Sequence, residues 1–559
     1  MNFPACLFLC CSAAFSSTLL VPSQYTTIQN AINAAQDGDS VLVSPGRYTE
    51  RIWFNGKAIA VIGTGGASQT VMRPNYSGSV VHFIEGETSS SVLRGFTLTH
   101  GTNTDFGGGI RCENSSPMIV DNRIVENSAD YGGGICCLGG SPTIQGNWIE
   151  RNGATSGGGI YCIDSSPSII ENTITAHEVD SAGAGIACFG GEPLIAGNLI
   201  TDNSIASFNN VAYGGGLFAG EGCILHLLCN TFVNNQVASY PQSPSGGGAC
   251  VKDIGGVIAG NTFIDNGAVS GGGLYIWGCD GLVITNSVFA WNNANKGAGI
   301  FCLGCPELTV RNCVIAANDG SHGTGIYFTG FYTGTYTLDL ANSILRWNSN
   351  EPLYLPGGNS VQIANISYTD MEYGQDSIYV GEGSILNWGQ GMIDADPLFV
   401  PGPLSNFHLD TDASPCIDAG DPDPLSCDPE DPLNPGYAMY PAQGGLRNDM
   451  GAYGGGGVGY WLGVEGESPP SPPESMQLRI SPNPFISCCS VSIRLQEPSC
   501  VTLDVYDIAG RMVTRLLDGS IPAEEYAVWF DGTLLPAGTY ILLLRSGEST
   551  ASGRCVLVR

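Results

Sequence analysis

The stretch that decides the fold runs from Gly107 to Cys137 and reads GGGIRCENSSPMIVDNRIVENSADYGGGICC. It contains one complete repeat and the start of the next. Each repeat opens with a glycine triplet and an Ile-x-Cys segment, then continues with Pro-x-Ile and Asn-x-Ile. Three short segments with alternating apolar residues, separated by turn residues, indicate three short β-strands per repeat.

The repeat extends over much of the chain. Related glycine triplets begin at Gly107, Gly132, Gly157, Gly183, Gly214, Gly246, Gly271, Gly297 and Gly323. A ladder of asparagines runs in step with them through Asn122, Asn147, Asn172, Asn198, Asn230, Asn261, Asn286, Asn312 and Asn342. Two registers that stay in step over so many units predict a solenoid.

Three strands per unit predict an all-β, right-handed parallel β-helix, in which equivalent residues of successive coils stack roughly 4.8 Å apart. We expect the isoleucines to point into a shared interior. The asparagine ladder fits a turn with positive φ, where each side-chain amide bonds the asparagine of the next coil. The glycine triplets allow a tight corner.

Cysteines accompany the isoleucines on the predicted interior face. Cys112, Cys137, Cys162 and Cys188 form a column, and Cys302 returns to it later. A metal site is the functional interpretation, but no histidine takes a matching position, so we interpret the column as core. An occasional disulfide between adjacent coils stays open.

Two repeats are longer than the others. The extra residues lie around 204–211 and 239–245. Insertions in a solenoid form loops on one flank and often mark its binding side.

The N-terminal end of the solenoid carries a predicted cap over Tyr25–Glu50. Thr27 can N-cap a short helix whose Ile28 and Ile32 share one face. The TIQNAI, DGD and PGRYTE motifs here resemble the opening of the pectin lyase-like β-helix superfamily. The resemblance implies the fold over roughly 22–348 and says little about a reaction. We place the whole β-helix domain, with irregular terminal coils, at residues 22–462.

Beyond Asn348 the period decays into an acidic, proline-rich segment. Its DPLF, SPCIDAG and DMGAY motifs resemble the terminal segment of many bacterial surface β-helix proteins. Asp418, Asp421, Asp423 and Asp428 are candidate Ca²⁺ ligands, because hard cations bind several carboxylate oxygens. A solvated acidic loop is the alternative, since the spacing matches no EF-hand.

Residues 463–475 form a predicted Pro-rich linker, and residues 476–559 a separate small β-sandwich domain. The motifs SPNPF, VYDIAGR and LPAGTY and the terminal VLVR resemble the immunoglobulin-like C-terminal sorting domain of type nine secretion cargo. Related hook-capping-type domains share much of this pattern. The resemblance implies outer-membrane secretion machinery as a partner.

The first 17 residues are predicted to be a signal peptide. A short apolar run, ACLFLCCSAA, is followed by small residues, although no Lys or Arg precedes it. With the sorting motifs, this predicts a protein that is secreted or attached to the outer surface of a Gram-negative-type bacterium.

Composition supports a folded, acidic, exported protein. Hydrophobic residues make up 43% of the chain and charged residues 13%, which is enough apolar material for a core. The net charge of -31 disfavours nucleic-acid binding and leaves cations and neutral glycans as partners.

Two sets of side chains are candidate functional residues. Asp105 and Asp130 precede successive glycine triplets, so they could form an acid–base pair with Arg111 nearby. An outward aromatic column suits carbohydrate stacking or, equally, plain strand stability, and consists of Tyr161, Phe218, Tyr275, Phe301 and Tyr327. We expect a non-catalytic binding or scaffolding protein, with glycan binding as its role and no cofactor other than Ca²⁺. The alternative is a secreted lyase or hydrolase that acts on acidic polysaccharide.

Overall fold

The protein is described here from a computed structural model. The described residues of the solenoid region are 17–75, 78–103, 105–207, 212–239, 245–400, 407–410, 413–431 and 434–457, and those near the C-terminus are 476–481, 488–495, 499–507, 512–521, 525–532, 535, 538–546 and 549–557. All but the last residue of the predicted signal peptide, and the whole linker at 463–475, lie outside these ranges.

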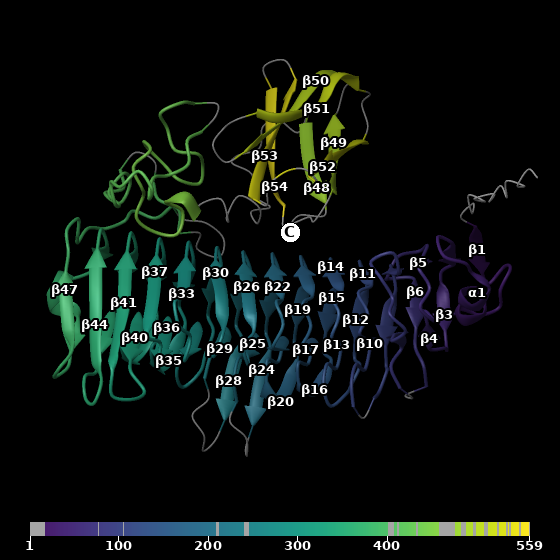
Figure 1. Ribbon diagram of the computed structural model, residues 1–559, viewed down its shortest axis with the longest axis horizontal. Helices are drawn as coiled ribbons and strands as arrows, with labels where there is room; N and C mark the ends of the chain where they lie inside the picture. The colour runs from purple at the N-terminus through teal and green to yellow at the C-terminus, as the bar shows by residue number, and fades with distance from the viewer. Residues whose placement is uncertain are drawn as a thin grey trace, which may run out of the picture.

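Three long parallel sheets, stacked along one axis, form the solenoid (Figure 1). Sheet A contains β1 (Thr18–Val21), β2 (Ser40–Val43), β5 (Ala60–Gly63), β8 (Val92–Arg94), β11 (Met118–Val120), β14 (Thr143–Gln145), β18 (Ser168–Ile170), β22 (Leu194–Ala196), β26 (Ile224–Leu228), β30 (Gly255–Ala259), β33 (Leu282–Thr285), β37 (Glu307–Arg311), β41 (Thr335–Ala341), β44 (Val361–Ser367) and β47 (Ile385–Trp388).

The second sheet of each coil, sheet B, contains β3 (Gly46–Tyr48), β6 (Thr70–Met72), β9 (Thr97–Thr99), β12 (Arg123–Val125), β15 (Trp148–Glu150), β19 (Thr173–Thr175), β23 (Leu199–Thr201), β27 (Thr231–Val233), β31 (Thr262–Ile264), β34 (Val288–Ala290), β38 (Val314–Ala316), β42 (Ile344–Arg346) and β45 (Asp370–Met371).

The third, sheet C, contains β4 (Ile52–Trp53), β7 (Val81–Phe83), β10 (Ile110–Glu113), β13 (Ile135–Leu138), β17 (Ile160–Ile163), β21 (Ile186–Phe189), β25 (Leu217–Gly220), β29 (Ala249–Lys252), β32 (Leu274–Trp277), β36 (Ile300–Leu303), β40 (Ile326–Thr329), β43 (Leu353–Leu355) and β46 (Tyr379–Val380).

The register of these sheets follows the repeat. Ile110 pairs with Ile135, and Cys112 pairs with Cys137 in the same two strands. Both columns belong to one buried core that runs through the coils. The prediction of a parallel β-helix with isoleucine and cysteine inside is therefore confirmed. Burial raises the pKa of the Cys112 thiol, as expected for a thiol in an apolar interior.

The glycine triplets make the corner between coils. Gly107 has φ +67°, a conformation that residues with a Cβ rarely adopt. A Cβ on Gly109 would lie 2.5 Å from the carbonyl oxygen of Gly134 in the next coil. The corner therefore needs glycine both for its backbone angle and for the close approach of the coils.

The asparagine ladder forms, but with a different backbone conformation from the predicted one. The backbone N–H of Asn122 donates to Oδ1 of Asn147 at 2.9 Å, and its side-chain amide donates to the same atom at 3.2 Å. The residue with positive φ is the preceding one, Asp121 at φ 53°. The side chain thus turns inward to satisfy buried backbone groups, and its neighbour makes the bend.

A second ladder, which the sequence analysis missed, lies at the next corner of each coil. It contains Asn127, Asn152, His177, Asn203, Asn235, Asn266, Asn292, Asn318 and Asn348. His177 replaces an asparagine there. Its Nδ1 accepts a hydrogen bond from the backbone N–H of Asn152 at 3.0 Å.

Some coils carry a fourth short strand beyond the predicted three. One extra parallel sheet contains β16 (Gly153–Ser156), β20 (Glu178–Ala182), β24 (Ser204–Ser207) and β28 (Gln236–Ser239), and another pairs β35 (Asn293–Lys296) with β39 (Asp319–His322). The predicted insertions begin inside β24 and at the end of β28. Their remaining residues, 208–211 and 240–244, lie outside the described ranges.

A short helix covers the N-terminal end as predicted. Helix α1 spans Ile28–Ala34, and the Thr27 side chain accepts a hydrogen bond from the Asn30 backbone N–H. Ile28 and Ile32 are fully buried against the first coils. Sheet A begins at β1, a few residues before the predicted start at residue 22.

The acidic segment after β47 folds back along the solenoid. Phe407, Met450 and Tyr453 pack on outward residues of β34 and β38, such as Val288 and Val314. This segment therefore covers part of the outer face of sheet B, where those strands present apolar side chains.

Near the C-terminus the described residues form two antiparallel sheets that share one core. One contains β48 (Met476–Ser481), β49 (Cys488–Leu495) and β52 (Glu525–Asp531); the other contains β50 (Ser499–Asp507), β51 (Met512–Ile521), β53 (Gly538–Ser546) and β54 (Ser549–Leu557). Across all described residues, no helix is long and apolar enough to cross a membrane.

Candidate functional site

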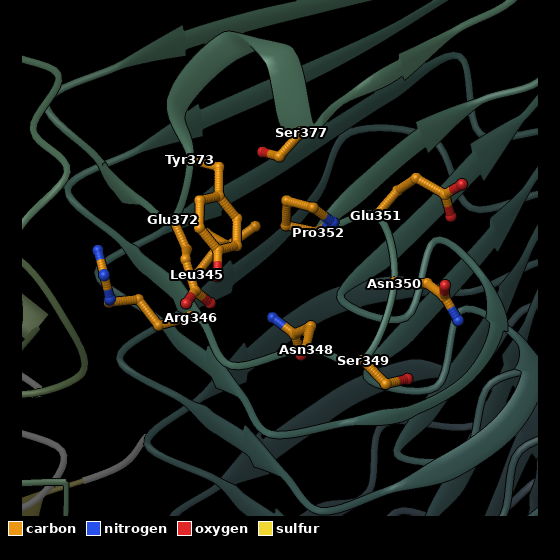
Figure 2. A pocket seen from close by; sticks show the side chains of 10 residues that line it. All are labelled: Leu345, Arg346, Asn348, Ser349, Asn350, Glu351, Pro352, Glu372, Tyr373 and Ser377. Atoms are coloured by element: carbon orange, nitrogen blue, oxygen red, sulfur yellow. The ribbon is translucent and has the colours of Figure 1, made fainter.

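A cavity of about 350 Å³ lies where the regular repeat ends. Figure 2 labels the ten residues that line it, which come from two chain segments, 345–352 and 372–377. Binding sites for small ligands occupy roughly 300–1,000 Å³, so the cavity can take one small ligand or one end of a larger one.

The cavity exists because the glycine corner is missing from this coil. Asn348 is the last member of the second ladder and accepts a hydrogen bond from the Asn318 backbone N–H at 3.1 Å. After it, Asn350 occupies the corner, and its side chain donates to the Gly320 carbonyl oxygen at 2.6 Å. The following coil bulges into the 3-10 helix η1 (Gly374–Ser377). The wider corner leaves space between the two coils.

Tyr373 supplies the aromatic surface of the cavity. It has φ 60° directly before η1, and its backbone N–H donates to Oδ2 of Asp394 at 3.1 Å. The side chain is 75% exposed, and Figure 2 shows its ring beside the ring of Pro352. A flat apolar ring over polar groups is a common arrangement for binding a sugar.

Two glutamates add charge without forming a pair. Oε2 of Glu372 accepts a hydrogen bond from the Trp347 backbone N–H at 2.6 Å, and Oε2 of Glu351 accepts one from Gly323 at 3.2 Å. Figure 2 shows the two carboxylates pointing to opposite sides of the cavity. They are therefore not placed to flank one scissile bond.

An ion-pair group behind Arg346 holds this part of the fold together. Its Nη1 lies 3.0 Å from Oδ1 of Asp370 and 2.9 Å from Oδ1 of Asp394. Burial raises the pKa of Asp370 to about 6, although the backbone N–H of Ala395 and the guanidinium oppose that rise. Because both carboxylates occupy it, the Arg346 guanidinium is committed to the scaffold.

The aromatic column, defined as Tyr161, Phe218, Tyr275, Phe301 and Tyr327, is outward-facing but much less accessible than the sequence suggests. Its members are only 5–8% exposed. The Tyr275 and Phe301 rings stack at 5.0 Å, and the Phe301 and Tyr327 rings at 5.1 Å. Since the ring faces cover one another, the structure favours strand stability for this column. Glycan binding by it stays a prediction.

The candidate catalytic residues are only partly brought together. Phe106 and Tyr131 form a parallel bridge, so the preceding Asp105 and Asp130 lie in successive coils, both exposed. The Arg111 guanidinium instead pairs with Glu113 at 2.8 Å. Catalysis by these residues stays a prediction.

The candidate Ca²⁺ ligands bind peptide N–H groups. The Asp418 carboxylate accepts hydrogen bonds from Gly445, and Asp428 accepts one from Asp449 at 3.1 Å. Asp421 and Asp423 each accept a hydrogen bond from the backbone two residues onward, at 3.0 Å. Within the described residues no group of three or more His, Cys, Asp or Glu could hold a metal ion. Binding of Ca²⁺ stays a prediction.

Two family models match the chain. One, described as a right handed beta helix region, matches residues 229–336. The other, described as a periplasmic copper-binding protein (NosD), matches residues 32–249. The chain is a parallel β-helix repeat protein. No curated protein matches this β-helix.

The copper named in the second description finds no matching donor set in the described part of this β-helix. Soft thiols such as Cys137 and Cys162 stack one per coil inside the core, and do not converge as metal ligands do. We therefore derive no metal chemistry for the β-helix.

Sequence reasoning missed the cavity of this β-helix. The available signal was the absence of a glycine triplet after Gly323 while the second asparagine ladder continued to Asn348. A broken corner in an otherwise regular solenoid marks a place where adjacent coils separate.

Proposed function

We propose that this protein is an exported, non-catalytic surface β-helix that binds a neutral glycan in the cavity beside Tyr373. The observation that carries the proposal is the exposed Tyr373 ring over a cavity lined by amide, hydroxyl and carboxylate groups. Sugar rings present an apolar face for stacking and hydroxyls that bond such groups.

A neutral glycan fits the local charge better than an acidic one. Glu351 and Glu372 line the cavity, and Arg346 is already paired with two carboxylates. The net charge of -31 adds repulsion for an anionic polymer. The non-catalytic part of the proposal rests on the opposite directions of the two glutamate carboxylates.

A glycan array with the full-length protein tests the proposal. We expect neutral glycans to bind, and Tyr373→Ala to weaken binding about tenfold or more, because the stacking surface is removed. Tyr332→Ala is the matched control, since Tyr332 is 72% exposed but does not line the cavity. Equal losses in both variants, or no binding to any neutral glycan, would contradict the proposal and leave a scaffold role.

We also infer that residues 476–559 form an immunoglobulin-like domain that directs export through the outer-membrane secretion machinery. The shared core of the two antiparallel sheets and the order of the sorting motifs support this inference. The similarity to a family described as periplasmic supports an envelope or extracellular location.

Deletion of residues 476–559 tests the export inference. We expect the shortened protein to accumulate inside the cell envelope of the native host, whereas the full-length protein reaches the surface or the medium. Unchanged export of the shortened protein would overturn the inference.

A further inference from the structure

Three buried nitrogen atoms without hydrogen-bond partners lie on two residues that are neighbours across sheet C. They are Nδ1 and Nε2 of His82 and Nε of Arg111. His82 of β7 and Arg111 of β10 are directly paired in the register. An unpaired buried nitrogen is costly, and such groups in one place point to a partner that completes them.

A second guanidinium lies on the other side of His82. Trp53 pairs with His82 across β4 and β7, and the two rings stack at 4.5 Å with an interplanar angle of 1°. The Arg51 guanidinium lies 5.1 Å from the centre of the Trp53 ring. It occupies space that a side chain at Gly78 would fill, since a Cβ there would collide with Nη1 of Arg51.

The charge of this cluster is unusual for such an acidic chain. The chain has 51 acidic against 20 basic residues, yet two arginines flank one histidine here. Arg111 pairs with Glu113, but Arg51 has no carboxylate partner among the ion pairs of the described residues. Burial, together with Arg51 and Arg111, lowers the pKa of His82 to about 4, so the ring is neutral near pH 7.

We infer that Arg51, His82 and Arg111 form a binding site for one oxyanion, a carboxylate or sulfate group of a ligand. Guanidinium groups bind such groups through charge-assisted hydrogen bonds, and the neutral imidazole donates one more. Trp53 forms an apolar wall beside the charged group. The ligand's oxyanion supplies the partner that the three buried nitrogens lack.

This site is separate from the cavity beside Tyr373 and does not depend on the proposed function. β7 and β43 are ten strand-to-strand steps apart in sheet C, which corresponds to about 48 Å. Figure 1 shows β4 and β10 near the opposite end of the solenoid from β44.

Titration of the full-length protein with sodium sulfate, and separately with sodium glucuronate, tests the inference at a fixed chloride background. The readout is the NMR signal of the His82 ring. We expect a saturable shift and a rise in the His82 pKa, because a bound anion favours the charged ring. The anion that saturates at the lower concentration identifies whether the site prefers sulfate or carboxylate.

Arg51→Gln should weaken binding about tenfold or more, because it removes a charged donor. Gly78→Ala should weaken it by displacing the Arg51 guanidinium. Arg94→Gln is the control, since Arg94 is an exposed arginine already paired with Asp121. An absence of saturation with both anions, or an equal effect of Arg94→Gln, would overturn the inference. Arg51 is partly exposed, so its variant is expected to fold even where a His82 variant does not.

Discussion

The side-chain amide of Asn312 donates a hydrogen bond of 2.8 Å to Oδ1 of Asn448, which lies 136 residues further along the chain. Asn312 belongs to the predicted ladder, yet it does not serve the ladder. It has φ 48° itself, and Cys313 takes the inward position beside it. The one-residue shift turns the amide outward, where it holds the acidic segment that folds back.

The same shift occurs at the neighbouring coils. Asn286 donates to the Ala452 carbonyl oxygen at 3.0 Å, and Oδ1 of Asn342 accepts from the Asp421 backbone N–H at 2.8 Å. Ser287 replaces asparagine inside and accepts from Asn261. The final coils thus use their asparagines to attach the segment instead of bonding one another.

Replacement of Asn312 by alanine should loosen this attachment. The buried Asn448 amide would lose a partner, at a cost of about 1–3 kcal/mol. We expect faster proteolysis within residues 413–457 and little change in the first coils. Asn234→Ala is the control, because Asn234 is exposed and bonds only Asp202 and Gln236 among the described contacts. Equal proteolysis of the two variants would argue against the attachment.

His177 should make the solenoid sensitive to acid. Burial lowers its pKa to about 4, below the ordinary value of 6.5. A lowered histidine pKa means that the folded state favours the neutral ring, so stability is complete above pH 6.5 and is lost as the pH falls towards 4. The loss is up to about 3 kcal/mol.

His177→Asn should remove this acid sensitivity, because asparagine is the usual ladder residue and does not titrate. The measurement is the midpoint of chemical unfolding at pH 7 and pH 5, with His226→Asn as the control at a less buried histidine. A His177→Asn variant with the same pH dependence as the native protein would show that His177 is not the cause.

The acidic segment should respond to pH in the opposite direction. Burial raises the pKa of Asp428 and of Asp449, and their mutual repulsion adds to the shift at Asp428. Raised carboxyl pKa values mean that the folded segment favours the protonated forms. Its stability is therefore complete below about pH 4 and declines as the pH rises through neutrality.

Asp428→Asn should reduce this decline, since the amide stays neutral at every pH. Proteolysis of residues 413–457 at pH 5 and pH 8, each compared with a reference substrate, measures it. Because every carboxylate of this acidic chain titrates, the comparison with Asp396→Asn on an exposed turn isolates the contribution of Asp428. An equal change in both variants would assign the effect to net charge.

Tyr327→Ala should destabilise the solenoid without affecting glycan binding. The ring is 8% exposed and stacks on Phe301 and Tyr354, so its removal leaves a gap and costs about 3 kcal/mol. Thermal unfolding and the glycan array measure the two effects separately. Loss of binding at unchanged stability would instead make the aromatic column the glycan site.

The enzyme alternative makes a prediction about Asp105. We expect no unsaturated or reducing ends when the protein is incubated with polyuronates, with or without Ca²⁺, because Arg111 is paired with Glu113. Product formation that disappears in Asp105→Ala would establish the lyase or hydrolase and reject the non-catalytic proposal.

The repeat of Gly107–Cys137 was sufficient to predict the coil, the interior column of Cys112 and Cys137, and the helix that Thr27 begins. These features follow from local rules: alternation sets which side chains face inward, and stacking repeats them at a constant spacing. The asparagine ladder was predicted for the same reason, although the positive φ belongs to residues such as Asp121.

The cavity beside Tyr373, the outward turn of Asn312 and the cluster around His82 depend on contacts between coils or between distant segments. Periodicity cannot reveal them, because each one arises where the repeat is broken or where a non-repeating residue occupies a repeating position. Burial of the aromatic column likewise depends on the rings above and below each member, so only the assembled sheet determines which surfaces remain free to bind.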